Sequence, residues 1–281
     1  EVDGADNQPH SMQMLADGGP SKGDGGSGNS GDPCAYWTGF SGQDLVTRMH
    51  SHLYDSYEPI QPEQDQGGNR NRYTTARMMM FTQVARYRSP NGRMVSECIY
   101  TGETSPQPDR ADPDREQLNC EHVMPRARME DDRDSVLYSH QQSDIHNLMP
   151  SVPGANSYRG SLPFGFVASD RELDYLPSVR GNNSTGDKVF EPRPIKRGDV
   201  ARIIFYFSVR WGIDIGADEE ADLKRWHRDD PVDIDERGRN DAVHRLQGTR
   251  NAFVDCPDLV DRIADFRGFT ILDSDQTLPR P

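Results

Sequence analysis

An α+β fold is predicted from three features of this 281-residue sequence. Apolar residues recur at helical spacing after Ser41 and over most of the C-terminal part. A strand–turn–strand pattern surrounds the turn sequence "SPNG" at 89–92. No strand–helix–strand alternation of the kind that builds a parallel sheet is visible. We therefore expect strands first and a mainly helical C-terminal half.

The first helix is predicted within residues 41–57, because Leu45, Met49 and Leu53 repeat every four residues and Ser41 is a plausible N-cap. A shorter helix at 74–81 and a hairpin across 82–102 follow, and then a loop at 104–116 rich in Pro and Asp. Further helices are predicted at 198–212, 219–230, 231–248 (with Pro231 near the first turn) and 256–266.

One folded domain is expected over residues 34–281. Residues 1–33 include "DGGPSKGDGGSGNSGDP" and hold almost no large apolar side chain, so we expect a flexible lead-in. The chain begins with Glu, and no leader with a charged and then an apolar region precedes it, which is typical of a processed or trimmed protein. No apolar run is long enough to span a bilayer.

The charge composition is acidic, and it favours Asp over Glu and Arg over Lys. The net charge is −14, and the 46 acidic residues comprise 33 Asp and 13 Glu, whereas the 32 basic residues comprise 28 Arg and only 4 Lys. Such a balance would normally argue against a polyanionic partner. An Asp-rich, Lys-poor surface suggests the hypothesis of a protein kept soluble in concentrated salt. If the partner is nonetheless a nucleic acid, the arginines must gather in one groove and the aspartates on the far faces.

The four cysteines, Cys34, Cys98, Cys120 and Cys256, lie outside any CxxC spacing. Two disulfides in an oxidising compartment are compatible with this number, with three connectivities available. Of these we favour Cys98–Cys120 together with Cys34–Cys256, and four free thiols remain the alternative.

The chemistry-bearing residues lie in "NCEHVMPRAR" at 119–128 and "SDIHNLMPSVPGANSYRG" at 143–160. Neighbours in a regular strand point to opposite faces, so Glu121 and His122 can serve one centre only where a strand ends or bends. Glu121 and Asn156 together would offer two hard oxygen ligands, which suits Mg²⁺ with several retained waters. A neutral His122 could then take a proton from water. The alternative is a pair of polar residues at a turn.

Arginines near these motifs could hold a phosphate through paired hydrogen bonds. The candidates are Arg126, Arg128, Arg133 and Arg159. Spacing alone does not choose among the first three for the scissile phosphate. The expected catalytic set is His122, Arg159 and Arg128, with Glu121 and Asn156 as metal ligands.

These motifs resemble the signature of the endonuclease I family, nonspecific nucleases built around a ββα-metal (His-Me) finger. "CEHVMP" and "SDIHNLMPSVPGANSYRGSLPFG" carry the resemblance, and "ARMMMF", "ECIYTG" and the segments at 190–211 and 223–263 extend it in order over about residues 40–265. The connection between the finger's halves is short here. "TRNAF" at 249–253 also lacks a proline that the family usually has.

The resemblance implies that His122 is the general base, that Glu121 and Asn156 bind the metal, and that Arg159 is phosphate-side or structural. It places "DIHNLMP" in the finger's second strand, with His146 and Asn147 bracing the site. It implies hydrolysis of single- and double-stranded DNA, and of RNA, to 5′-phosphate and 3′-hydroxyl ends, with Mg²⁺ replaceable by Mn²⁺ or Ca²⁺.

We therefore expect a secreted or periplasmic, monomeric endonuclease that contacts the phosphate backbone and no membrane. Two alternatives stay open: a catalytically silent nucleic-acid-binding relative, and a metal-dependent phosphodiesterase of small substrates.

Overall fold

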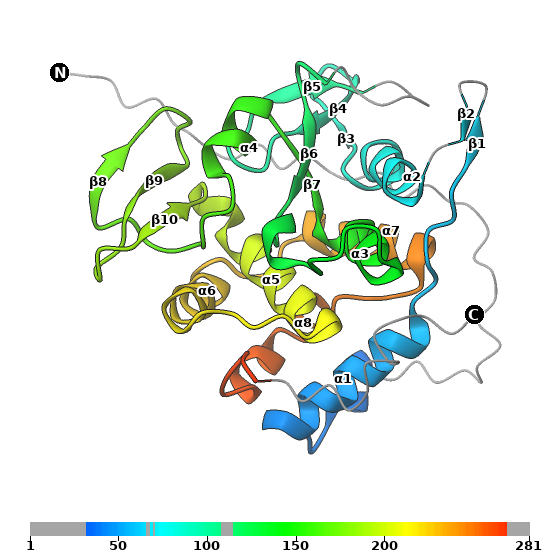
Figure 1. Cartoon of the computed structure of the whole chain (residues 1–281), viewed down its shortest axis with the longest axis vertical. Helices are drawn as coiled ribbons and strands as arrows, with labels where there is room; N and C mark the ends of the chain where they lie inside the picture. The colour runs from blue at the N-terminus through cyan, green and yellow to red at the C-terminus, as the bar shows by residue number, and fades with distance from the viewer. Residues whose placement is uncertain (1–31, 66–67, 70, 108–114, 269–281) are drawn as a thin grey trace.

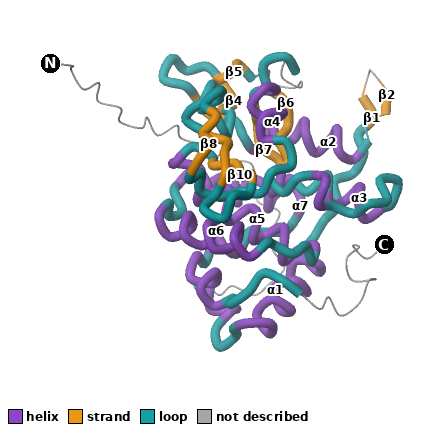
Figure 2. Tube along the Cα trace, turned by 60° about the vertical axis from the view of Figure 1, so that its left-hand side comes forward, coloured by secondary structure: helices purple, strands orange, loops and turns teal. Residues whose placement is uncertain are grey.

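The computed structural model describes residues 32–65, 68–69, 71–107 and 115–268 (Figure 1). Except for Asp32 and Pro33, the predicted lead-in at 1–33 lies outside the described residues. Helices and small antiparallel sheets are mixed, as an α+β class requires. In Figure 2 most strands gather in the upper part of the molecule, and much of the helical C-terminal half lies below them.

The N-terminal part follows the predicted order. A 3₁₀ helix, Pro33–Trp37, precedes α1 (Gly42–Ser56), which buries the Leu45, Met49 and Leu53 side chains as their spacing predicts. Ser41 occupies the N-cap position of α1, although its side chain makes no capping hydrogen bond. The second predicted helix is α2 (Arg72–Met79), which continues as a π-helical turn, Met80–Val84.

Within the described residues the strands form four small antiparallel sheets. β3 (Tyr87–Arg88) and β4 (Met94–Glu97) are the predicted hairpin around 89–92, and β5 (Thr104–Pro106) completes their sheet, at the start of the segment expected as a loop. The remaining pairings are β1 (Gln64–Asp65) with β2 (Gly68–Asn69), β6 (Asn119–His122) with β7 (Leu148–Ser151), and the sheet of β8 (Ser169–Glu172), β9 (Val179–Asn182) and β10 (Lys188–Glu191).

The C-terminal part is helical, with α5 (Arg197–Trp211) at its centre. Nearly all of the α5 side chains are buried, and the helix packs against α1, α6 (Ala217–Asp229) and α8 (Ala252–Asp255). α7 is Ile234–Gln247 and begins after an Asp233 N-cap, so Pro231 precedes the helix and is not in its first turn as predicted. None of the described helices has the length and apolar character needed to cross a membrane.

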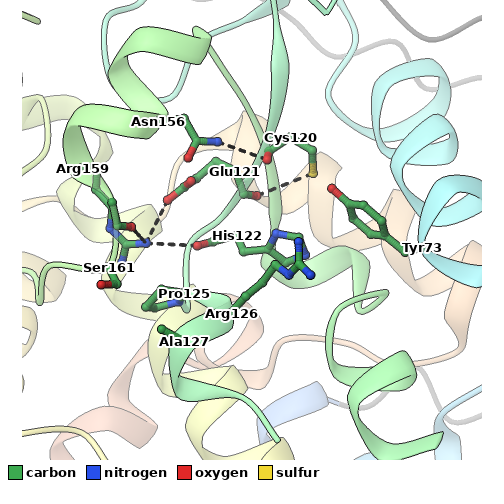
Figure 3. A pocket seen from close by; sticks show the side chains of 11 residues that line it. Tyr73, Cys120, Glu121, His122, Pro125, Arg126, Ala127, Asn156, Arg159 and Ser161 are labelled. Atoms are coloured by element: carbon green, nitrogen blue, oxygen red, sulfur yellow. Dashed lines mark hydrogen bonds and ion pairs between the residues drawn. The ribbon is translucent and has the colours of Figure 1, made fainter. Parts of the chain in front are cut away.

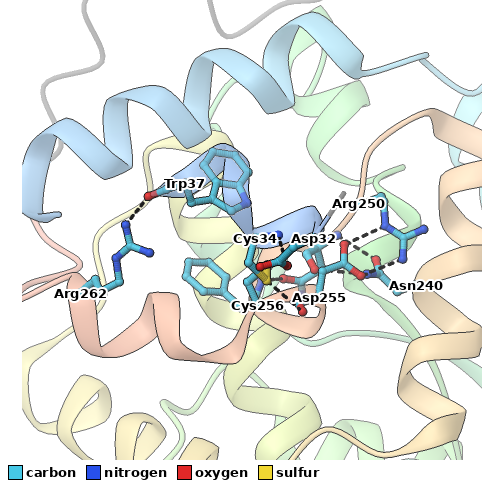
Figure 4. The surroundings of a disulfide bond; sticks show 10 residues. Asp32, Cys34, Trp37, Asn240, Arg250, Asp255, Cys256 and Arg262 are labelled. Carbon is cyan, nitrogen blue, oxygen red and sulfur yellow. Dashed lines mark hydrogen bonds and ion pairs between the residues drawn. A yellow bond between two sulfur atoms is a disulfide. The ribbon is translucent and has the colours of Figure 1, made fainter. Parts of the chain in front are cut away.

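Residues 257–262 form a 3₁₀ helix, Pro257–Arg262, within the segment predicted as a longer helix. The segment is tied down by Arg262, which donates hydrogen bonds to the carbonyls of Trp37 and Phe40 (Figure 4). These contacts hold the end of the described chain against its beginning.

One disulfide joins Cys34 to Cys256, as predicted, with 5.6 Å between their Cα atoms (Figure 4). The predicted Cys98–Cys120 disulfide is wrong, because neither sulfur is part of a disulfide. The backbone explains this: Cys120 pairs with Pro150 across one edge of β7, and the Ile99 amide donates to the Pro150 carbonyl from the other edge. Two strand spacings of about 4.8 Å each exceed the reach of a disulfide.

Candidate functional site

The candidate site is built by β6, β7 and α4 (Pro153–Arg159), which follow one another along the chain in the order that the resemblance implies. β6 ends at His122, which lies opposite Leu148 of β7. The connection between the strands holds α3 (Val136–Gln141) and two 3₁₀ turns. α4 begins with Pro153 and ends at Gly160, whose φ of 59° favours glycine.

A cavity of about 310 Å³ opens at this place (Figure 3). Its lining includes four of the five predicted site residues, namely Glu121, His122, Asn156 and Arg159. Glu121 and His122 are neighbours in sequence and still line one cavity, because they lie where β6 ends. A position at the end of a strand is what the sequence predicts for this pair. The fifth, Arg128, is not part of the lining.

Glu121 is buried, with 2% of its surface exposed. Its Oε1 atom accepts hydrogen bonds from the Tyr100 hydroxyl at 2.6 Å and from Arg159 Nη1 at 3.0 Å. The His122 backbone amide also interacts with this carboxylate, and no side chain of the described residues donates to Oε2. Burial raises the pKa of Glu121, and Arg159 and then Tyr100 oppose that rise. The result is a carboxylate that is held through one oxygen and has spare acceptor capacity on the other.

The His122 ring is held in one tautomer. Its Nε2 atom lies 2.9 Å from the Gln142 carbonyl oxygen, which can only accept, so Nε2 carries the hydrogen and Nδ1 carries the lone pair. Burial lowers the pKa of His122 to about 4, so the ring is neutral at pH 7. The Tyr73 ring lies against the imidazole, with 5.3 Å between centroids. A neutral, oriented imidazole is the form that a general base requires.

The Asn156 side chain is oriented by its amide nitrogen. Nδ2 donates to Asn119 Oδ1 at 3.0 Å and to the Cys120 carbonyl at 3.2 Å, and Figure 3 shows this nitrogen turned toward Cys120. Because the backbone carbonyl accepts only, the amide oxygen is the atom left without a partner among the described residues. Asn156 thus also keeps one oxygen available.

Arg159 is buried, at 1% exposure, and contacts the chain rather than solvent. Besides Glu121, it donates to the carbonyls of His122 at 3.2 Å and Val123 at 2.7 Å. Its guanidinium therefore braces the backbone just after β6 while touching the carboxylate.

The three arginines that the sequence could not separate occupy different places. Arg126 is exposed, lines the cavity, and donates through Nε to the Tyr138 hydroxyl at 2.5 Å. Arg128 points to α6 and donates to Glu219 at 2.8 Å and to the Asp214 carbonyl at 2.6 Å. Arg133 is exposed and donates to the Arg126 carbonyl at 2.7 Å.

The bracing residues suggested by the resemblance make internal contacts. Asn147 exchanges hydrogen bonds with the Met124 backbone at 2.6 and 3.0 Å, and His146 Nε2 lies 3.1 Å from the Thr249 carbonyl. Arg239 donates to three carbonyls around the start of β7. Asn147 therefore fixes the chain that leaves β6 beside the cavity.

Sequence reasoning did not identify Tyr100, Asn119, Tyr73 or the Gln142 carbonyl. Tyr100 and Asn119 belong to the quoted motifs "ECIYTG" and "NCEHVMP", but nothing in their spacing assigns a contact. Each contact depends on long-range packing, and the Gln142 contact involves a backbone atom that carries no sequence signal.

The donor set fits a hard divalent cation. Glu121 Oε2 and Asn156 Oδ1 are both oxygens with spare acceptor capacity, on residues that line one cavity. No group of three or more His, Cys, Asp or Glu side chains suited to a metal occurs among the described residues. Two protein oxygens leave the rest of an octahedral shell to water and phosphate, which is the arrangement Mg²⁺ favours.

Comparison with known proteins gives consistent findings. The sequence model described as endonuclease I matches residues 60–258. An extracellular ribonuclease of Bacillus amyloliquefaciens is 28% identical over 66% of this chain and 60% of its own length. An extracellular ribonuclease of Bacillus subtilis is 34% identical, covering 43% of this chain and 46% of its own length. A periplasmic deoxyribonuclease of Aeromonas hydrophila is 25% identical, over 43% and 51%. The chain thus spans roughly half of these relatives.

Proposed function

Because this chain belongs to the endonuclease I family, we propose that it is a metal-dependent endonuclease that hydrolyses DNA and RNA with little sequence preference. One observation carries the proposal: a neutral His122 and two oxygens with spare acceptor capacity, on Glu121 and Asn156, belong to one cavity. The relatives' names, both ribonuclease and deoxyribonuclease, support the two substrate classes. The segment β6–β7–α4 is then the ββα-metal finger.

In this mechanism His122 Nδ1 accepts a proton from a water molecule while Nε2 stays bonded to the Gln142 carbonyl. The water oxygen bonds to phosphorus, the bond from phosphorus to the 3′ oxygen breaks, and that oxygen takes up a proton. The products end in a 5′-phosphate and a 3′-hydroxyl. Mg²⁺ held by Glu121 and Asn156, or Mn²⁺ or Ca²⁺ in its place, would supply positive charge for the phosphoryl oxygens and the leaving oxygen.

The arginines have separate roles in this proposal. Arg126 is exposed and lines the cavity, so it contacts the phosphate. Arg159 acts through Glu121 as a positioning residue, since its hydrogen bonds are all made inside the protein. A direct role for Arg128 remains a prediction from the sequence, and its hydrogen bonds to Glu219 and the Asp214 carbonyl favour a structural one.

Backbone contacts explain the absence of a base-reading motif, because phosphate contacts position a protein without specifying sequence.

The proposal includes activity at high salt, supported by the excess of Asp and the scarcity of Lys. It also includes a location in the periplasm or outside the cell, supported by the extracellular and periplasmic relatives, and a monomeric state, which stays a prediction from the sequence. Within the cavity lining, Arg126 and Arg159 outnumber the single carboxylate.

The test is plasmid and RNA digestion across metals and NaCl concentrations, with and without chelator. We expect degradation that chelator abolishes, 5′-phosphate ends, and activity that persists as NaCl rises. His122→Ala should lose most hydrolysis and still shift DNA in a gel. Binding without cleavage by the parent protein would instead identify a silent relative. A bis-nitrophenyl phosphate turned over far better than DNA would identify a phosphodiesterase of small substrates.

A further inference from the structure

Each candidate metal ligand, Glu121 or Asn156, has two polar side-chain atoms. One atom of each pair already takes part in hydrogen bonds within the protein. Glu121 Oε1 receives the Tyr100 hydroxyl at 2.6 Å and Arg159 at 3.0 Å, which fills its lone-pair directions. Asn156 Nδ2 gives both of its hydrogens, to Asn119 Oδ1 and to the Cys120 carbonyl. The remaining atoms, Glu121 Oε2 and Asn156 Oδ1, receive no hydrogen bond from a side chain of the described residues.

The Tyr100 contact is the shorter of the two on Glu121. Tyr100 is fully buried, and its backbone is anchored because the Ser178 hydroxyl donates to its carbonyl at 2.7 Å. The hydroxyl therefore approaches Glu121 from inside the protein, away from the open side of the cavity. A donor fixed on one carboxylate oxygen leaves only the other oxygen for a cation.

The Asn119 contact constrains Asn156 in the same way. Asn119 precedes Glu121 by two residues on β6, so both side chains belong to the same face of the strand. Its Oδ1 accepts from Asn156 Nδ2, and it reinforces the amide orientation that the Cys120 carbonyl, which only accepts, also favours. One strand thus carries a candidate ligand and the residue that orients the other ligand.

We propose that Tyr100 and Asn119 are positioning residues that set the cation site by committing one atom of each ligand, so that Glu121 Oε2 and Asn156 Oδ1 are presented together. The proposal rests on the metal-dependent function proposed above. Outer contacts of this kind typically change metal affinity 10- to 100-fold when they are removed.

The test measures binding of Mn²⁺ alone to the full chain, from the loss of the free-ion signal in electron paramagnetic resonance at 0.5 M NaCl. At this salt concentration charge effects through water are screened. Tyr100→Phe removes one hydroxyl, and we expect about a tenfold weaker Kd. Asn119→Ala should weaken the Kd by a similar factor. Asn119→Asp keeps an acceptor for Asn156 Nδ2 and should restore binding to near the parent value.

Tyr206→Phe is the matched control. Tyr206 is also buried, and its hydroxyl also donates to a carboxylate, Asp144, at 3.1 Å, but it does not line the cavity. Its loss should leave the Kd unchanged. Because both phenylalanine variants delete a buried hydroxyl, a general packing effect would change both alike. If Tyr100→Phe fails to fold, the two Asn119 variants decide the question.

The outcomes separate this proposal from the proposed function. If Glu121→Gln abolishes Mn²⁺ binding while Tyr100→Phe and Asn119→Ala bind as tightly as the parent, the positioning role is overturned and the metal role stands. A failure of Asn119→Asp to rescue would also overturn the role of Asn119. If the parent binds no Mn²⁺, or Glu121→Gln binds it unchanged, both proposals fall.

Discussion

Two buried carboxylates, Glu121 and Asp144, have similar surroundings but differ in how many of their oxygens accept hydrogen bonds from side chains. Burial raises the pKa of each, and each accepts a tyrosine hydroxyl. Both oxygens of Asp144 are occupied, Oδ1 by the His146 amide and Gln247, and Oδ2 by Tyr206 and Trp211. Among the described residues, side chains donate to only one oxygen of Glu121.

The difference shows how a structural carboxylate can be told from a functional one. A buried carboxylate stabilises a fold when donors satisfy both oxygens, as at Asp144, which links the start of β7 to α5 and α7. A carboxylate left half satisfied at a cavity costs free energy unless a ligand completes it. Glu121 is of the second kind, so changes at the two positions should affect different properties.

The largest expected effect is the loss of cleavage in Glu121→Gln. Glutamine can still accept from Tyr100 and Arg159, but it replaces the charged oxygen that would hold the cation. We expect plasmid cleavage to fall about 10³-fold, since metal stabilisation of the transition state is worth several kcal/mol. Because the variant leaves the buried Arg159 without its counterion, cleavage is compared per folded molecule, at a temperature where the variant is folded. Cleavage near the parent rate would contradict the assignment of Glu121.

The reciprocal change, Asp144→Ala, should affect stability. It removes an acceptor from four buried donors, and we expect a loss of roughly 3–4 kcal/mol in the free energy of unfolding, measured by urea titration. Cleavage per folded molecule should stay within a few-fold of the parent at a temperature where the variant is folded. If Asp144→Ala kept its stability but lost cleavage, Asp144 would be a functional carboxylate and its assignment as a structural one would be wrong.

Much of the fold was predictable from local patterns. α1, the β3–β4 hairpin, α5 and α6 follow from apolar periodicity and turn residues, which are local properties. The sheet of β8, β9 and β10 was missed because its first strand, Ser169–Glu172, is mostly exposed and has no apolar alternation. The Cys98–Cys120 pairing failed because sequence spacing does not reveal that β7 lies between the two thiols.

The candidate site was predictable as a set of residues and less so as a set of contacts. Glu121, His122 and Asn156 could be selected because their chemical types suit a cation and a base. The structure brings these three residues to one cavity. The choice among Arg126, Arg128 and Arg133 depends on which neighbours each meets, and Glu219 of α6, which holds Arg128, is 91 residues away in the chain.

The same contrast applies to two arginines and gives a smaller effect. Arg126 lines the cavity, whereas Arg128 donates to Glu219 and to the Asp214 carbonyl. We expect Arg126→Ala to lower kcat/KM about tenfold and to reduce the salt dependence of DNA binding by about one counterion. Arg128→Ala should leave both near the parent values and lower the unfolding midpoint. If the two variants changed kcat/KM equally, lining the cavity would not distinguish the role of Arg126 from that of Arg128.

The smallest effect concerns histidines. His227 uses both ring nitrogens inside the chain, Nε2 at 2.9 Å from the Pro257 carbonyl and Nδ1 at 3.4 Å from Arg202, whereas His122 has a ring nitrogen without a partner among the described residues. Burial, and then Arg202, lower the pKa of His227 to about 4, below the value of about 6.5 expected in the unfolded chain.

Between those two pH values the unfolded chain binds more protons, so the stability that neutral His227 gives is present above about pH 6.5 and is lost as pH falls toward 4. His227→Gln can keep one donor and one acceptor but cannot be protonated. The slope of unfolding free energy against pH should therefore fall by up to about 1.4 kcal/mol per pH unit in the variant. Urea titrations at pH 7, 6 and 5 measure this, and the difference from the parent cancels the contribution of other groups. If the plots of unfolding free energy against pH are parallel for variant and parent, His227 takes up its proton without unfolding. Hydrogen bonding to both ring nitrogens would then not explain why a buried histidine stays neutral.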